Sequence, residues 1–241
     1  MTTEDHIMKS SNNKLINSSE IVQQSKDFLK KDLNKSGAIL YSGIETLQKG
    51  EYYLLGINPG GSGGNSLAEH IDHLPNQNEN AYLDEDWISP SGNNPEFFGK
   101  APYQKRVQWL LESLEQATRN VFASNLNFFR TPNVQGITMD EATLCWNVHE
   151  LMLDIVKPHV ILSIGNADDP AKSAYAFIKH RYGGQVLETI NAKHAKYSIK
   201  ILAIQRNGSS ILVIGFPHFS RYNPEGKVDI KHLREIINKY K

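Results

Sequence analysis

Short strand-like apolar runs alternate with longer amphipathic segments along most of this chain. The strand-like runs cover residues 52–57, 121–123, 160–164, 198–205 and 211–216. Runs of this length, bounded by turn residues, predict strands. The segments in which apolar residues recur every three or four positions cover residues 102–117, 138–156 and 229–240. That spacing predicts amphipathic helices.

Turn and cap residues complete this pattern. Asp169 followed by Pro170 is typical of a helix start, and we expect that helix to run to about Arg181. Asn207-Gly208 between two apolar runs predicts a hairpin, which would add an antiparallel strand. Strands that alternate with helices predict an α/β fold with three α/β/α layers and a central, mainly parallel sheet.

The N-terminal part of the chain differs from the rest. Residues 1–17 are polar without periodicity, and Ser18 or Ser19 could cap a helix that runs to about Leu33. We therefore expect a polar extension with one helix over residues 1–35 and a single α/β domain over residues 36–241. The start of the chain has no basic and apolar signal pattern, and no apolar run could span a bilayer, so we expect a cytoplasmic protein.

The segment over residues 61–95 is rich in Gly, Asn, Asp and Pro and has no strand or helix pattern. A loop this long in a compact domain is usually functional or disordered. Residues 61–100 carry one basic and seven acidic residues, whereas residues 181–241 carry eleven basic and four acidic residues. The net charge is zero, but a local basic face can bind phosphates. An ordinary solvated surface would look the same.

Polar side chains follow the first and the last strand-like runs. Asn58 lies in Gly56-Ile57-Asn58-Pro59-Gly60, and His218 follows Pro217. Because ligands in open α/β sheets bind outside the carboxyl ends of the strands, these two side chains suggest one active site. The glycine-rich segment lacks the Gly-Lys-Ser/Thr of a phosphate loop and the spacing of a dinucleotide site. A tight turn would explain the glycines equally well.

Other segments offer weaker signals. Asn125 follows the second strand, and its amide offers a donor and an acceptor that suit the edge of a nucleobase, although turn hydrogen bonds are the common role of such a residue. Phe98 could stack on a base or fill the core. His70 and His73 have no further candidate ligand nearby, so we expect surface residues there and no metal site. The single cysteine, Cys145, argues against a thiolate metal site.

The order of these motifs resembles the uracil-DNA glycosylase superfamily over roughly residues 50–240. Gly56-Ile57-Asn58-Pro59-Gly60 is similar to the first motif of the mismatch-specific and single-strand-selective branches. The segment from His218 to Pro224 is similar to the second motif. Segments similar to three other family segments begin at Phe98, Asn125 and Lys157.

The resemblance implies a monofunctional DNA glycosylase that removes uracil or a related base and leaves an abasic site, without metal or cofactor. It implies that Asn58 orients the attacking water and that His218 donates to the base as negative charge develops. The implied base-binding residues are Gly56, Ile57, Gly60, Phe98 and Asn125, and the implied DNA contacts are Ser220, Arg221 and Tyr222. Asn125 would read the uracil edge, and Gly60 would leave room for 5-substituted uracils. DNA is the implied partner, and we expect a monomer.

The chain departs from the family pattern in two places. Phe219 and Arg221 replace prolines of the second motif, and the acidic segment over residues 61–95 is additional. Two other interpretations therefore stay open. The chain could bind a nucleic acid or a nucleobase without excision, or it could hydrolyse free nucleosides if the insertion covers the pocket.

Overall fold

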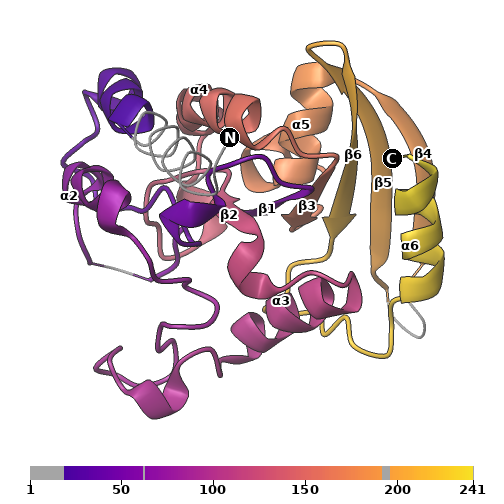
Figure 1. Ribbon diagram of the computed structural model, residues 1–241, viewed down its shortest axis with the longest axis horizontal. Helices are drawn as coiled ribbons and strands as arrows, with labels where there is room; N and C mark the ends of the chain where they lie inside the picture. Colours follow the sequence, from indigo (N-terminus) through magenta and orange to yellow (C-terminus); the bar gives the residue numbers. More distant parts are fainter. Residues whose placement is uncertain (1–18, 62, 192–195, 241) are drawn as a thin grey trace, which may run out of the picture.

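The computed structural model describes residues 19–61, 63–191 and 196–240 and has a six-stranded sheet at its centre, in the order β2-β1-β3-β6-β5-β4 (Figure 1). The strands are β1 (Tyr52–Gly56), β2 (Phe122–Asn125), β3 (Val160–Ile164), β4 (Gln185–Asn191), β5 (Ser198–Arg206) and β6 (Ser209–Phe216). β2, β1, β3 and β6 pair in parallel, and β6, β5 and β4 pair antiparallel. The predicted mainly parallel sheet is confirmed.

Helices cover both faces of this sheet (Figure 1). They are α2 (Leu67–His73), α3 (Pro102–Ser113), α4 (Met139–Val156), α5 (Ala174–Tyr182) and α6 (Ile230–Lys239). Side chains alternate along β1, so that Tyr53 and Leu55 join the core under α4 and α5, while Tyr52 and Leu54 join the core under α3 and α6. The three predicted α/β/α layers are therefore confirmed. No helix among the described residues is both long and apolar enough to cross a membrane.

The hairpin and most element ends agree with the sequence signals. Asn207 and Gly208 both have positive φ, as a two-residue hairpin turn requires, and they join β5 to β6. Thr138 caps α4 through a capping box with Glu141. Asp229 caps α6.

Several boundaries differ from the expectation for local reasons. α3 ends at Ser113, because Glu115 adopts a left-handed conformation. Asp169 caps only the 3-10 turn η6 (Pro170–Lys172), and α5 starts after its own cap, Ser173. β4 was not predicted, because it is an edge strand whose side chains are half-buried or exposed.

The N-terminal helix belongs to the packed structure. Its described part covers residues 19–29, and it buries Ile21 and Leu29 against the core under α4. A turn follows, in which the Asp32 amide donates to the Leu29 carbonyl, so the helix stops before Leu33. Next, the backbone of Leu40 forms a bridge with Ser124, which covers part of the outer edge of β2.

The segment over residues 61–95 contains regular structure that the sequence did not predict. Ser66 and Glu69 form a capping box that starts α2, and two 3-10 turns follow, η2 (Leu74–Asn76) and η3 (Pro95–Phe97). A helix of seven residues is too short for periodicity to reveal. We call the part from residue 77 to residue 99 the insertion loop. It packs on α3, where Gln104 donates to the carbonyl oxygens of Ala81 and Glu85.

Candidate functional site

The four parallel strands β2, β1, β3 and β6 lie side by side and end at one edge of the sheet (Figure 1). Gly56 at the end of β1 pairs with Asn125 at the end of β2, and Ile164 of β3 pairs with Phe216 of β6. Asn58 follows β1 by two residues, and His218 follows β6 by two residues. Asn58, Asn125 and His218 therefore share the carboxyl edge of one sheet.

Asn58 is half-buried, and its side-chain amide nitrogen is fully engaged. Nδ2 donates to the Thr131 hydroxyl at 2.9 Å, to the Thr131 carbonyl at 3.2 Å and to the Pro59 carbonyl at 2.7 Å. Carbonyl oxygens only accept hydrogen bonds. A flipped amide would place Oδ1 of Asn58 against the carbonyl oxygens of Pro59 and Thr131, so this orientation of the amide is the one that the bonds allow. Oδ1 is consequently fixed as an acceptor on the opposite side of the amide. Thr131 was not predicted, because it lies six residues beyond the end of β2.

Asn125 is 4% exposed, and its Nδ2 finds no hydrogen-bond acceptor among the described residues. Its Oδ1 lies over Gly56, where a Cβ atom would overlap it. The Tyr41 hydroxyl lies near this amide; burial raises the pKa of Tyr41, and the Asn125 amide opposes that rise. A buried donor without a partner costs roughly 1–3 kcal/mol, which a ligand with a matching acceptor would recover.

A buried histidine holds the backbone of Asn125 from behind. His149 Nε2 lies 2.8 Å from the Asn125 carbonyl, and Nδ1 lies 2.8 Å from the Tyr53 hydroxyl. Since the carbonyl only accepts, Nε2 carries the proton and Nδ1 accepts from Tyr53. Burial lowers the pKa of His149 to about 4, so the ring is neutral at neutral pH. This network fixes the end of β2.

His218 is half-buried and is oriented by Ser220. Its Nδ1 lies 2.7 Å from the Ser220 hydroxyl and accepts from the Ser220 backbone amide at 3.3 Å. An amide only donates, so Nδ1 is unprotonated and the neutral ring carries its proton on Nε2. Burial and the charge of Arg221 lower the pKa of His218. At neutral pH the ring therefore presents one N–H donor, and that Nε2 has no hydrogen-bond partner among the described side chains.

Gly165, just after β3, lets the two sides of the site approach each other. A Cβ atom at this position would lie 2.8 Å from Ile57 Cδ1 and 3.8 Å from His218 Cδ2. Gly165 also has a φ of 120°, which side chains rarely tolerate. Ile57 and His218 thus both lie close to Gly165, at a position where only glycine fits.

Four aromatic side chains connect the surroundings of Asn125 with His218. Tyr41 lies 6.2 Å from Tyr82 and 6.4 Å from Trp87, measured between ring centroids. Trp87 lies 6.0 Å from Tyr103, and Tyr103 lies 5.4 Å from His218. We call Tyr41, Tyr82, Trp87 and Tyr103 the aromatic cluster. Its members come from three separate segments, so no local pattern could have revealed it.

The segment after His218 is anchored by its own aromatic residues. Phe219 is buried beside Tyr103, and its carbonyl accepts a hydrogen bond from Arg106 of α3. Tyr222 is 1% exposed and packs against Tyr197, so its ring lies in the core and is not available to contact DNA as predicted. Ser220 and Arg221 are exposed, and their contact with DNA stays a prediction.

The remaining predicted base contacts differ in their surroundings. Gly60 is exposed, and a Cβ atom there would have no neighbour within 4 Å, which agrees with open space at this position. Phe98 is half-buried at the end of η3, and its backbone forms a bridge with Asp86. Phe98 is the ring that the sequence predicted under the base. Among the described residues, a different ring, that of Tyr103 in α3, contacts His218.

The expectation that His70 is a surface residue was wrong in part. His70 is half-buried, its Nδ1 accepts from the Ile39 amide at 3.4 Å, and burial lowers its pKa to about 4, whereas His73 is exposed. Within residues 19–61, 63–191 and 196–240, no three His, Cys, Asp or Glu side chains come together as metal ligands would.

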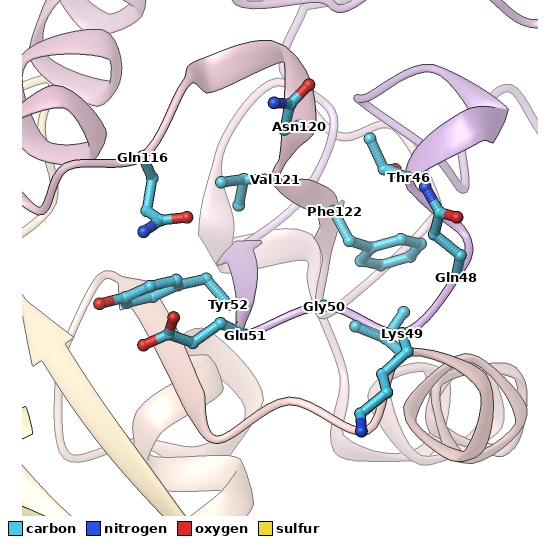
Figure 2. Close-up of a pocket in the computed structure, with 11 residues that line it drawn as sticks. Thr46, Gln48, Lys49, Gly50, Glu51, Tyr52, Gln116, Asn120, Val121 and Phe122 are labelled. Carbon is cyan, nitrogen blue, oxygen red and sulfur yellow. The ribbon is translucent and has the colours of Figure 1, made fainter. Parts of the chain in front are cut away.

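A separate cavity lies at the opposite end of the strands. Figure 2 shows side chains around it that come from the segment before β1, including Lys49 and Glu51, and from the start of β2, including Phe122. Its volume is about 60 Å³. None of the predicted site residues lines it, so we place the candidate site at the carboxyl edge, where the oriented polar groups lie.

Comparison with known proteins adds no family to this description. No protein-family model matches the chain, and no curated protein matches it. The similarity to the uracil-DNA glycosylase superfamily therefore rests on the motifs in the sequence, and membership of that superfamily stays a prediction.

Proposed function

We propose that this protein is a DNA glycosylase that hydrolyses the N-glycosidic bond of uracil or a related damaged base and leaves an abasic site. The observation that carries the proposal is the buried side chain of Asn125, whose Nδ2 has no acceptor at normal hydrogen-bond geometry among the described residues and has the Tyr41 hydroxyl as a neighbour, at the same sheet edge as Asn58 and His218. A site with an unsatisfied buried donor discriminates strongly between ligands that supply the acceptor and ligands that lack it.

Base recognition in this proposal falls to Asn125. Its Nδ2 donates to a carbonyl oxygen of the base, and its Oδ1 accepts from a ring N–H, which is the pattern of the uracil edge. The His149 network keeps the end of β2 in place, so that the amide meets the base without rearrangement. The open space at Gly60 leaves room for a substituent on the ring.

His218 stabilises the leaving group. When the glycosidic bond breaks, negative charge develops on the base and positive charge on the sugar. A neutral histidine with its proton on Nε2 donates to the anionic carbonyl oxygen, and a fixed donor of this kind requires no reorganisation during the reaction. Because burial and Arg221 lower the pKa of His218, this neutral form persists at neutral pH.

Asn58 provides the acceptor for the attacking water. With Nδ2 tied to Thr131 and Pro59, Oδ1 is the free end of the amide, and it accepts a hydrogen bond from the water while a lone pair of the water faces the sugar cation. When the water oxygen bonds to the sugar, the proton that it releases passes to the anionic base. An amide is a poor base, so Asn58 orients the water more than it deprotonates it. We therefore expect a modest rate. This chemistry uses side chains of the chain alone, and we propose that the protein acts on DNA as a cytoplasmic monomer.

Base release from labelled oligonucleotides tests the proposal. Single- and double-stranded substrates would each carry one uracil, 5-hydroxymethyluracil, hypoxanthine or mismatched thymine. We expect alkali-sensitive cleavage that Asn58→Ala and His218→Ala reduce by roughly a hundredfold or more. Asn78→Ala and His180→Ala, at exposed positions, are the matched controls. Cleavage that survives both site substitutions, or its absence with every substrate, would refute the proposal.

Nucleoside hydrolysis is the second candidate, and one observation favours it. Tyr82 and Trp87 of the insertion loop pack beside Tyr103, whose ring contacts His218. A site made for a small ligand would release uracil from free uridine or deoxyuridine faster than from an oligonucleotide. Running both substrates in the same assay separates the two functions.

A further inference from the structure

We infer that Trp87 is a stacking platform for an unpaired nucleobase of a single-stranded nucleic acid that enters the site beside His218. The inference deepens the proposed function and rests on it, because it names the form of the strand. It concerns a residue of the insertion loop. Trp87 lies outside the first motif, from Gly56 to Gly60, and outside the second motif, from His218 to Pro224.

Trp87 belongs to an exposed apolar pair. Its side chain is 37% exposed, and that of the following residue, Ile88, is 46% exposed. Among the large apolar side chains that are exposed in the described residues, these two alone are neighbours in the chain. Adjacent exposed apolar residues near a site mark a binding surface more often than single ones do.

The insertion loop holds this pair in a fixed position. Asp86 is buried and accepts hydrogen bonds from the backbone amides of Ile88, Ser89 and Asn94. The Trp87 indole donates to the Glu85 carboxylate at 2.6 Å. Exposure of the ring is therefore built into the loop, and a preorganised ring loses little freedom when a ligand stacks on it.

The indole makes ring contacts with its aromatic neighbours, and part of its side chain stays exposed. Trp87 contacts Tyr82 edge to face at 5.7 Å and Tyr103 at 6.0 Å, and Tyr103 in turn contacts His218. Trp87 is thus one side chain away from the histidine. A nucleotide next to the reacting one would lie over the exposed part of the indole.

Exposed basic side chains are available to follow a nucleic-acid backbone. Several acidic side chains of the acidic segment are already engaged, since Asp84 pairs with Arg119, Asp72 pairs with Lys26 and Asp86 is held in the loop. Lys100 and Lys105 are exposed at the start of α3, close in the sequence to Tyr103, and Arg221 is exposed three residues after His218. Basic groups that follow the backbone, with an aromatic ring for the bases, are the usual combination for single strands.

Tryptophan fluorescence tests the inference without any base excision. The chain has three tryptophans, and Trp146 is fully buried in the core while Trp109 is half-buried on α3. We expect a short oligothymidylate to quench the emission of the wild-type protein and to leave that of Trp87→Phe nearly unchanged. By a second method, such as anisotropy of a labelled oligothymidylate, Trp87→Ala should bind about tenfold more weakly. Trp109→Phe should keep both the quenching and the affinity.

The outcomes separate the inference from the proposed function. Thymine is a 5-methyluracil, so base release from the oligothymidylate is followed in the same samples, and binding is compared under conditions in which none occurs. Quenching that depends on Trp87, with no base release from any oligonucleotide, would support the platform and refute the glycosylase. Equal quenching by thymidine monophosphate and by the oligomer, or an unchanged affinity in folded Trp87→Ala, would overturn the platform.

Discussion

The side-chain amide of Asn58 donates to the hydroxyl of Thr131 at 2.9 Å, and this bond ties the segment after β1 to the segment after β2. Thr131 in turn donates to the Asn133 carbonyl at 2.8 Å, so its hydroxyl both accepts and donates. The orientation of Asn58 is therefore decided by a residue far away in the sequence.

Thr131→Val should lower the rate of base release. Expressed as free energy, this loss should exceed the decrease in the free energy of unfolding. The substitution keeps the shape of the side chain but removes the hydroxyl, and one hydrogen bond of about 1 kcal/mol corresponds to roughly a fivefold loss of kcat. Thr131→Ser should restore most of the rate, because it restores the acceptor. Equal rates in Thr131→Val and wild type, measured with saturating substrate, would show that Thr131 does not orient Asn58.

Gly56→Ala should disable Asn125 while the sheet persists. A methyl group at position 56 overlaps Oδ1 of Asn125, so the amide must leave its place. We expect base release to fall by at least about tenfold. Gly50→Ala is the matched control just before the other end of β1, where a Cβ atom would make only ordinary contacts at 3.7 Å. A similar loss of activity in both variants would point to general damage to the strand.

Arg221→Ala should raise the pKa of His218. Burial and the Arg221 charge both lower this pKa, so removing the charge moves it back toward the ordinary value of about 6.5. Arg221→Lys keeps the charge and should leave the pKa nearly unchanged. An NMR titration of the His218 ring measures its pKa in both variants. The acid limb of the pH profile of base release should move to higher pH in Arg221→Ala alone. An unchanged titration in Arg221→Ala would contradict the electrostatic coupling.

His149 should make the protein less stable in acid. Its pKa is about 4 in the folded state and about 6.5 when unfolded, so the unfolded chain binds the proton more readily. The contribution of His149 to the free energy of unfolding is fully present above about pH 6.5. It is lost as the pH falls toward about 4, and the total loss is roughly 3 kcal/mol. Urea unfolding at about pH 7 and about pH 5 should show a larger decrease in the free energy of unfolding for wild type than for His149→Gln. Parallel decreases would refute this role.

The positions of Asn58, Asn125 and His218 at the ends of strands were readable from the sequence. Buried parallel strands are continuous apolar runs, and the residue after each run is local information. The burial of Tyr222 and the exposure of Trp87 were not readable. Both are large aromatic residues in polar segments, and only packing decides that Tyr222 is buried while Trp87 is partly exposed.

By itself the sequence determined the layers, the mainly parallel sheet and the hairpin, because hydrophobic periodicity and turn chemistry act over a few neighbouring residues. Only the tertiary structure decided which side chains meet at the site. Thr131 reaches Asn58, His149 reaches the Asn125 backbone and Trp87 joins Tyr103, and each pair comes from different elements or loops. Hydrogen bonds and ring contacts between distant segments depend on the sheet order and on the path of the insertion loop, which local patterns do not encode.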